Sequence, residues 1–174
     1  MSLKAQIQND LKDFLKAGKK FEAGVLRMIL SSIHNREIEK RSKLSKSEPL
    51  EKLEELSKLT EEEIIETLSS EAKKRKEAIF DYERGKRQDL ADKEKKEIEI
   101  LQKYLPEQLS EEEIKKFAKE AIAALQASLA PGEREKIGPR EIGKVMGGLM
   151  PKIKGRADGT LVSEIVKSLL AKPS

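Results

Sequence analysis

The segment from Gly143 to Gly159 holds the residues of this chain best suited to binding chemistry. It contains five of the ten glycines and only one acid. Its four basic residues are Lys144, Lys152, Lys154 and Arg156. Flexible basic side chains beside glycine-rich backbone and a helix N-terminus suit phosphate oxygens. The segment therefore predicts contact with a phosphate backbone through these four side chains.

The glycines of this segment need a physical reason. Glycine inside a helix costs roughly 0.5–1 kcal/mol relative to alanine. Gly143 and Gly147 are four residues apart, so they share one helix face. Two explanations stay open: tight packing against a neighbouring helix, or the close approach of a binding partner.

The charge distribution singles out the same end of the chain. From Gly138 onward there are seven basic and three acidic residues, whereas residues 1–137 hold 29 of each, so the net charge of +4 resides in the last fifth. This excess is either a solvated surface or a polyanion-binding tail. About four phosphate contacts would give a slope of log K against log salt near −3. Aromatic residues make up only 3%, which disfavours base stacking.

No constellation of catalytic residues is present in the sequence. The chain has no cysteine and one histidine, His34, which is expected at the surface. Neither a phosphate-binding P-loop nor a Gly-x-Ser-x-Gly elbow occurs. We therefore predict no catalytic residue, metal or cofactor, and the balance is against an enzyme.

Two arginines fall among apolar residues. Arg27 lies between Val25 and Leu30, and Arg75 lies on the apolar stripe of a long helix. Inter-helix ion pairs are one interpretation, with Glu71, Glu94 or Glu97 as acids, and a substrate-facing role is the other.

Apolar periodicity predicts the helices that position these residues. Four N-terminal helices follow the rows Leu3–Leu15, Phe21–Ile33, Ile64–Tyr82 and Leu90–Leu105, and a mobile linker is expected at about residues 42–59. Gly18 and Gly85 mark helix ends, Thr60 with Glu63 forms a capping box, and Asp89 suits an N-cap.

Three further helices are predicted after Pro106. The first opens with a capping box of Ser110 and Glu113 and precedes a loop at residues 127–136 around Pro131 and Gly132. The second begins near Pro139, buries Ile142 to Met150 and leads into a connector at residues 152–159. Asp158 is the expected N-cap of the last helix.

The predicted fold class is therefore all-α. An N-terminal four-helix hairpin domain, residues 1–105, precedes a small three-helix C-terminal domain, residues 106–174. No apolar run is long enough to span a membrane, and the absence of cysteine suggests a cytoplasmic location.

Several motifs together resemble the GatB/YqeY family over nearly the whole chain. They are Leu26-Arg-Met-Ile29, Lys74-Arg75, Gly85-Lys-Arg-Gln-Asp-Leu90, Tyr104-Leu-Pro-Glu-Gln-Leu-Ser-Glu-Glu-Glu-Ile114, Gly143-Lys-Val-Met-Gly147 and Gly155-Arg-Ala-Asp-Gly159. The linker at Ser42 to Leu59 is longer than the family pattern suggests.

The resemblance implies a C-terminal domain similar to the tail of the GatB component of the tRNA-dependent amidotransferase, which helps hold tRNA. It implies tRNA contacts at Lys144, Lys152, Lys154 and Arg156, with Gly143, Gly147 and Gly155 permitting close approach. The amidotransferase or a synthetase would be the protein partner. The catalytic domains of that enzyme are missing here.

Three functions follow from these observations. The leading hypothesis is a stand-alone tRNA-binding or amidotransferase-associated accessory protein that is non-catalytic by itself. The alternative is a helical protein–protein interaction adaptor. The third is a carbon–nitrogen ligase with glutamine as amido donor, an activity that the family resemblance could imply but these residues do not support.

Overall fold

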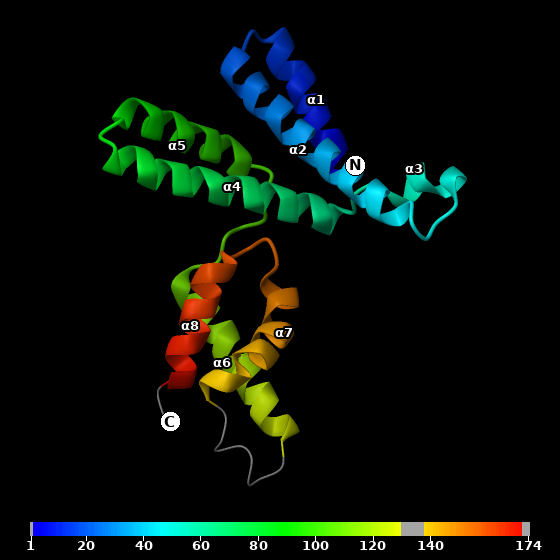
Figure 1. The fold of residues 1–174 in the computed structure, drawn as a ribbon. Coiled ribbons are helices and arrows are strands. Elements are labelled where there is room, and N and C mark those ends of the chain that lie inside the picture. The colour runs from blue at the N-terminus through cyan, green and yellow to red at the C-terminus, as the bar shows by residue number, and fades with distance from the viewer. Residues whose placement is uncertain (1, 130–137, 172–174) are drawn as a thin grey trace. The chain divides into compact units, whose positions relative to one another are not determined.

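The computed structural model describes residues 2–129 and 138–171, and every regular element among them is helical (Figure 1). The all-α prediction is confirmed. The chain divides into two compact units, Met1–Pro106 and Glu107–Ser174. The loop predicted around Pro131 and Gly132 lies outside the described residues.

The N-terminal unit consists of two antiparallel helical hairpins joined by a short helical segment (Figure 1). The first hairpin pairs α1 (Leu3–Lys16) with α2 (Lys20–Leu44), and the second pairs α4 (Glu61–Arg84) with α5 (Gln88–Gln102). Between them lie the 3₁₀ turn η1 (Leu50–Lys52) and α3 (Leu53–Leu56). Because each helix buries one apolar face, the hairpins pack where these faces meet.

The core of this unit draws on all four long helices. Its buried side chains are Ile7, Val25, Leu26, Ile29, Ile33, Ile64, Leu68, Ile100, Leu101 and Tyr104. The Tyr104 hydroxyl donates to Asp10 Oδ2 at 2.7 Å, which ties the chain just after α5 to α1. Burial, and then this hydrogen bond to a carboxylate, raises the pKa of Tyr104.

The first hairpin turns at Gly18, as the sequence predicts. Gly18 has a φ of +69°, in the left-handed region that favours glycine. Its N–H donates to the Leu15 carbonyl at 3.2 Å, and the Lys19 N–H donates to the Phe14 carbonyl at 2.9 Å. These two bonds satisfy carbonyls at the end of α1 in a Schellman motif.

The second hairpin turns at Lys86, although α4 does end beside Gly85 as predicted. Gly85 has an ordinary φ of −77°, whereas Lys86 has a φ of 56°. The Arg87 N–H donates to the Tyr82 carbonyl at 2.8 Å, and the Lys86 N–H donates to the Glu83 carbonyl at 3.1 Å. A lysine therefore holds the left-handed position of this Schellman motif.

The segment predicted as a linker, residues 42–59, contains helical structure. The helix α2 continues to Leu44, and η1 and α3 follow. Leu53 is buried and α3 contacts α2. Leu50, in contrast, remains 77% exposed.

The C-terminal unit is a three-helix arrangement in which α6 (Glu111–Ser128), α7 (Ile142–Ile153) and α8 (Gly159–Ala171) each contact the other two. A 3₁₀ turn, η3 (Pro139–Glu141), leads into α7. The core includes Ile114, Val145, Leu149, Ile153 and Val166. None of the described helices, in either unit, is long and apolar enough to cross a membrane.

Candidate nucleic-acid interface

The solvent-facing side of α7 is formed almost entirely by glycine and lysine. Val145, Leu149 and Ile153 point into the core. The exposed residues, which we call the glycine face of α7, are Gly143, Lys144, Gly147, Gly148, Pro151 and Lys152. At 3.6 residues per turn these positions cover about half of the helix circumference. Apart from the two lysines and the proline ring, this face has no side chains.

The glycines of this face are not required by packing within the unit. Among the residues that the structure describes, a Cβ atom added at Gly143, Gly147 or Gly148 would meet no group within 4 Å beyond the helix's own backbone. Tight packing against another described helix of the C-terminal unit, one of the two explanations open at the sequence level, therefore does not account for these glycines. Each glycine nevertheless costs helix stability relative to alanine. Packing within the C-terminal unit therefore does not explain why these three exposed helix positions are glycine.

Lys144 and Lys152 project from the glycine face itself. They are eight residues apart, so about 12 Å of helix separates them, and Gly148 lies midway. Both side chains belong to exposed residues. The pair therefore brackets a stretch of helix backbone that a partner can approach closely.

Pro151 lies within α7, which therefore extends further than the sequence predicted, to Ile153. Proline has no N–H, so the Gly147 carbonyl receives no hydrogen bond from position 151. The proline ring would also crowd the carbonyl four residues earlier. Ile153 is fully buried beyond this point, which explains why the helix persists.

Gly155 has a role in the turn between α7 and α8. The Arg156 N–H donates to the Ile153 carbonyl at 2.9 Å. Between them Lys154 has φ −54° and ψ 128°, and Gly155 has φ +74°. These are the angles of a type II turn, which needs glycine at its third position. The turn is enough to account for this glycine.

Asp158 occupies the N-terminus of α8. Its Oδ1 accepts the Thr160 N–H at 2.7 Å and the Leu161 N–H at 3.3 Å. A carboxylate already bonded to these donors repels a phosphate at the same place. The phosphate contacts expected of this segment must therefore come from its side chains rather than from these two backbone N–H groups.

Arg156 is half-buried and holds the chain that enters α6. Its Nε donates to the Glu107 carbonyl at 3.3 Å, and its carbonyl accepts the Leu109 N–H at 2.7 Å. Gln108 Nε2 also donates to the Gly155 carbonyl at 2.9 Å. Of the four predicted phosphate contacts, Arg156 thus has a structural task as well, whereas Lys144 and Lys152 are on the open face.

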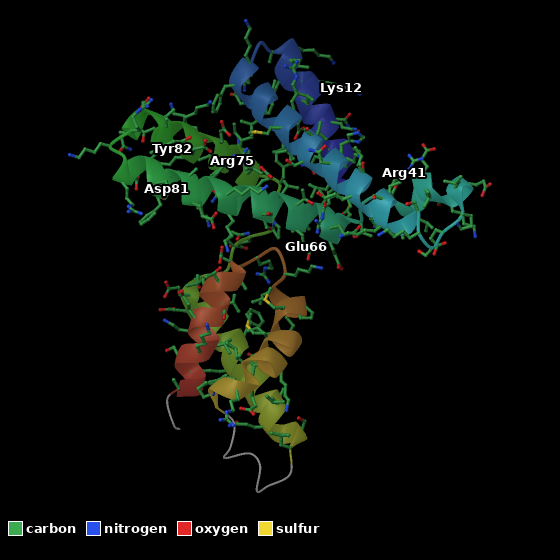
Figure 2. The ribbon with its side chains drawn as sticks, in the orientation of Figure 1. Lys12, Arg41, Glu66, Arg75, Asp81 and Tyr82 are labelled. Carbon is green, nitrogen blue, oxygen red and sulfur yellow. The ribbon has the colours of Figure 1, made fainter. Side chains whose placement is uncertain are left out.

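The two arginines singled out in the sequence, Arg27 and Arg75, differ sharply, and Figure 2 shows Arg75 between α4 and α5. Arg75 is buried inside the unit, and its predicted acids are all present: Glu71 at 3.0 Å, Glu97 at 3.1 Å and Glu94 at 3.9 Å. The ion-pair interpretation is confirmed for Arg75. It is wrong for Arg27, which is exposed and has no such pair among the residues that the structure describes.

Two of the acids around Arg75, Glu71 and Glu94, have shifted pKa values. Burial, followed by the charge of Glu97, raises the pKa of Glu94. Burial alone would raise the pKa of Glu71 too, but hydrogen bonds from Lys74 and Arg75 outweigh it and lower that pKa. No group of metal-ligating side chains occurs in the part of the chain that the structure describes. The buried ion pair between Arg75 and Glu97 joins α4 to α5.

Fold and surface together define an all-helical protein of two compact units, the second of which presents an exposed basic helix face rich in glycine. The chain belongs to the YqeY-like protein family, which matches residues 4–170. The resemblance drawn from the sequence motifs is thereby confirmed.

Individual relatives are more varied. An uncharacterized protein of Schizosaccharomyces pombe is 35% identical over 109 residues, 63% of this chain and 76% of the other. The mitochondrial "altered inheritance of mitochondria protein 41" of Pyrenophora tritici-repentis is 28% identical over 168 residues, 95% of this chain and 79% of the other. A glutamyl-tRNA(Gln) amidotransferase component of Aeropyrum pernix is 40% identical over 68 residues, 39% of this chain but 10% of the other.

The predicted cytoplasmic location is contradicted by these names. The Pyrenophora relative is named as mitochondrial, and so is a Candida glabrata protein of the same name that is 31% identical over 124 residues, 70% of this chain and 61% of the other. The prediction rested on the absence of cysteine, which does not distinguish one compartment from another.

Proposed function

We propose that this protein is a non-catalytic tRNA-binding accessory protein associated with tRNA-dependent amidation, and that the glycine face of α7 contacts the RNA backbone. The observation that carries the proposal is the set of three exposed helical glycines without packing partners, bracketed by Lys144 and Lys152. An evolved helix that loses stability at three exposed positions fits a surface that must be approached closely.

The amidotransferase relationship supports tRNA as the polyanion. The relative from Aeropyrum pernix carries tRNA(Gln) in its name, and the matched stretch is 39% of this chain. That stretch is only 10% of the amidotransferase component. The shared portion is therefore better suited to binding tRNA than to carrying out the whole amidation reaction. The amidotransferase or a synthetase is the candidate protein partner.

The binding mode is electrostatic and reads no bases. Lys144, Lys152 and Lys154 supply point charges for phosphate oxygens, with Arg156 adding a fourth. Gly143 and Gly147 let the RNA backbone come within contact distance of the helix, and Gly155 shapes the turn that presents Lys154. Such contacts give modest affinity that falls steeply with salt.

A tRNA titration across a salt series tests this function. The variant should be Lys144→Gln with Lys152→Gln, because Arg156 also supports the fold. Lys116→Gln with Lys119→Gln is the matched control, since both lysines are exposed on α6 of the same unit. We expect the α7 variant to reduce the salt slope by roughly 1.5 and the control to change it little. Equal effects of both variants would contradict the α7 interface.

A further inference from the structure

The neutral balance of residues 1–137 conceals a strong segregation of charge in the N-terminal unit. Residues 1–47 hold eleven basic and five acidic residues, a net charge of +6. Residues 48–72 hold two basic and nine acidic residues, a net charge of −7. The first segment comprises α1 and α2, so one hairpin is strongly basic.

The outer side of α2 carries a continuous row of exposed residues. The row, called here the α2 row, consists of Lys20, Gly24, Arg27, Ser31, His34, Ile38 and Arg41, and all seven residues are exposed. Spacings that alternate between four and three residues keep the row on one side of the helix. It is about 32 Å long at 1.5 Å per residue. It contains no acid.

The basic residues of the row are not neutralised. Elsewhere on this hairpin, Lys4 pairs with Glu37 at 2.7 Å and Arg36 pairs with Glu39 at 3.0 Å. Within the described ranges, Lys20, Arg27 and Arg41 form no ion pair. Arg41 extends from the outer end of α2 in Figure 2. Three full charges are therefore available on one helix side.

A glycine near the N-terminal end of the row repeats the feature seen on α7. Gly24 is exposed within α2, and a Cβ atom there would meet no described group within 4 Å beyond the helix's own backbone. Packing does not require a glycine here, and glycine makes the helix less stable than alanine would. Together with Ser31, which is also small, Gly24 leaves room for a partner on both sides of Arg27.

The composition of the row decides the kind of partner. A helical partner needs apolar residues at alternating three- and four-residue spacing, and a membrane surface needs an apolar face. Ile38 is the one apolar member of the row, and Phe21 and Met28, each 40% exposed, lie to one side of it on α2 rather than on the row itself. Three unpaired cations without an acid instead complement a phosphate backbone, and the acidic residues 48–72 would repel that backbone beyond the end of α2.

We propose that the α2 row is a second RNA-backbone surface, so that each unit of the protein contributes one basic helix to the same tRNA. This inference rests on the proposed function and adds to it. Because both surfaces belong to one chain, binding at one raises the effective concentration of the other. Two weak electrostatic contacts thereby give a useful affinity.

The test compares three variants of the full chain in tRNA titrations from low to moderate salt, and the first two of them remove the same charge. The row variant is Lys20→Gln, Arg27→Gln, Arg41→Gln. Its control is Lys93→Gln, Lys96→Gln, Lys103→Gln, which removes the same charge from exposed positions on and next to α5. The third is the α7 double variant. Circular dichroism should show equal helicity in all of them.

We expect the row variant to bind roughly tenfold more weakly near 0.1 M salt and to lower the salt slope by roughly 2–2.7, whereas its control stays close to wild type. A row variant that matches its control overturns this inference, and loss of binding in the α7 variant alone would then leave the proposed function intact. Loss in the row variant alone supports the row and overturns the α7 interface. Failure of the wild-type protein to bind tRNA overturns both.

A vesicle arm separates RNA from a membrane surface. Vesicles containing phosphatidylserine replace tRNA in the same series, with the row variant and its control. We expect no binding that depends on the row, because one apolar residue cannot anchor a helix in lipid. Row-dependent vesicle binding without row-dependent tRNA binding would overturn the proposal.

Discussion

Arg75 Nε lies 3.1 Å from Glu97 Oε2, and both residues are more than nine-tenths buried between α4 and α5. Arg75 also donates to the Glu71 carbonyl and carboxylate, each at 3.0 Å. Desolvating a guanidinium is costly unless it is paired, so these acids make its burial possible. The ion pair thereby fixes the register of the second hairpin.

Removing one partner of this ion pair should strongly destabilise the protein. Glu97→Gln removes a negative charge that offsets the cost of burying the Arg75 guanidinium. We therefore expect a loss of about 3 kcal/mol in the free energy of unfolding, measured by urea denaturation. Glu83→Gln is the control, since it breaks an exposed pair with Lys95 and should cost less than about 1 kcal/mol. Equal losses for the two variants would show that burial of the pair is unimportant.

The two flanking acids should respond to pH in opposite ways. The pKa of Glu94 is raised in the folded protein, so its contribution to stability is complete at low pH and is lost as pH rises through that pKa. Glu94→Gln should therefore raise the denaturation midpoint at pH 7, and this gain should vanish toward pH 4.

The pKa of Glu71, in the same cluster, is shifted in the opposite direction from that of Glu94. Its pKa is lowered, so its stabilisation is present above the unfolded value of 4.5 and is lost as pH falls through the folded pKa. Glu71→Gln should lower the midpoint at pH 7 and converge with wild type in acid. Parallel pH profiles for the two variants would contradict these assignments.

The left-handed conformation of Lys86 predicts a stabilising substitution. A non-glycine residue at a φ of 56° costs roughly 1 kcal/mol, and the greater chain entropy of glycine offsets part of the gain. Lys86→Gly should stabilise the protein by about 0.5 kcal/mol in urea denaturation. Lys96→Gly, inside α5, removes the same side chain and should cost about 0.7–1 kcal/mol. Destabilisation by both would mean that Lys86 has contacts of its own in solution.

Local signals predicted much of this fold because they act within a few residues. Thr60 and Glu63 form the predicted capping box, with bonds of 3.2 and 2.7 Å, and Ser110 and Glu113 form the other. Gly18 occupies the expected left-handed position. Arg75 was recognised because a charged residue on an apolar stripe needs an acid.

The sequence-based predictions that failed also have specific causes. Asp89 was expected to cap α5, but Arg87 holds that position and binds the Asp89 carboxylate through two bonds of 3.0 and 2.9 Å. The helix α7 continues through Pro151 because Ile153 is buried in the core. The α2 row was missed because the net charge was counted over residues 1–137 as a whole. In that count the positive charge of the first hairpin is cancelled by the acidic residues that follow it.

The glycine face predicts opposite effects on stability and on binding. Replacing Gly143, Gly147 and Gly148 by alanine places each methyl group in open space, so each change should stabilise the helix by about 0.5–1 kcal/mol. The same variant should bind tRNA more weakly, because three methyl groups hold the backbone away. Unchanged tRNA affinity in the stabilised variant would mean that the glycines do not serve RNA approach.

The most direct test of the central claim is site-specific crosslinking to tRNA from the glycine face. The chain has no cysteine, so Gly148→Cys introduces a unique thiol for a short photo-crosslinker, and Glu120→Cys on α6 is an exposed control in the same unit. We expect a tRNA crosslink from position 148 that salt abolishes, and little or none from position 120. Equal crosslinking from both positions, or none from position 148 in a protein that binds tRNA, would contradict the assignment of α7 as the RNA-binding surface.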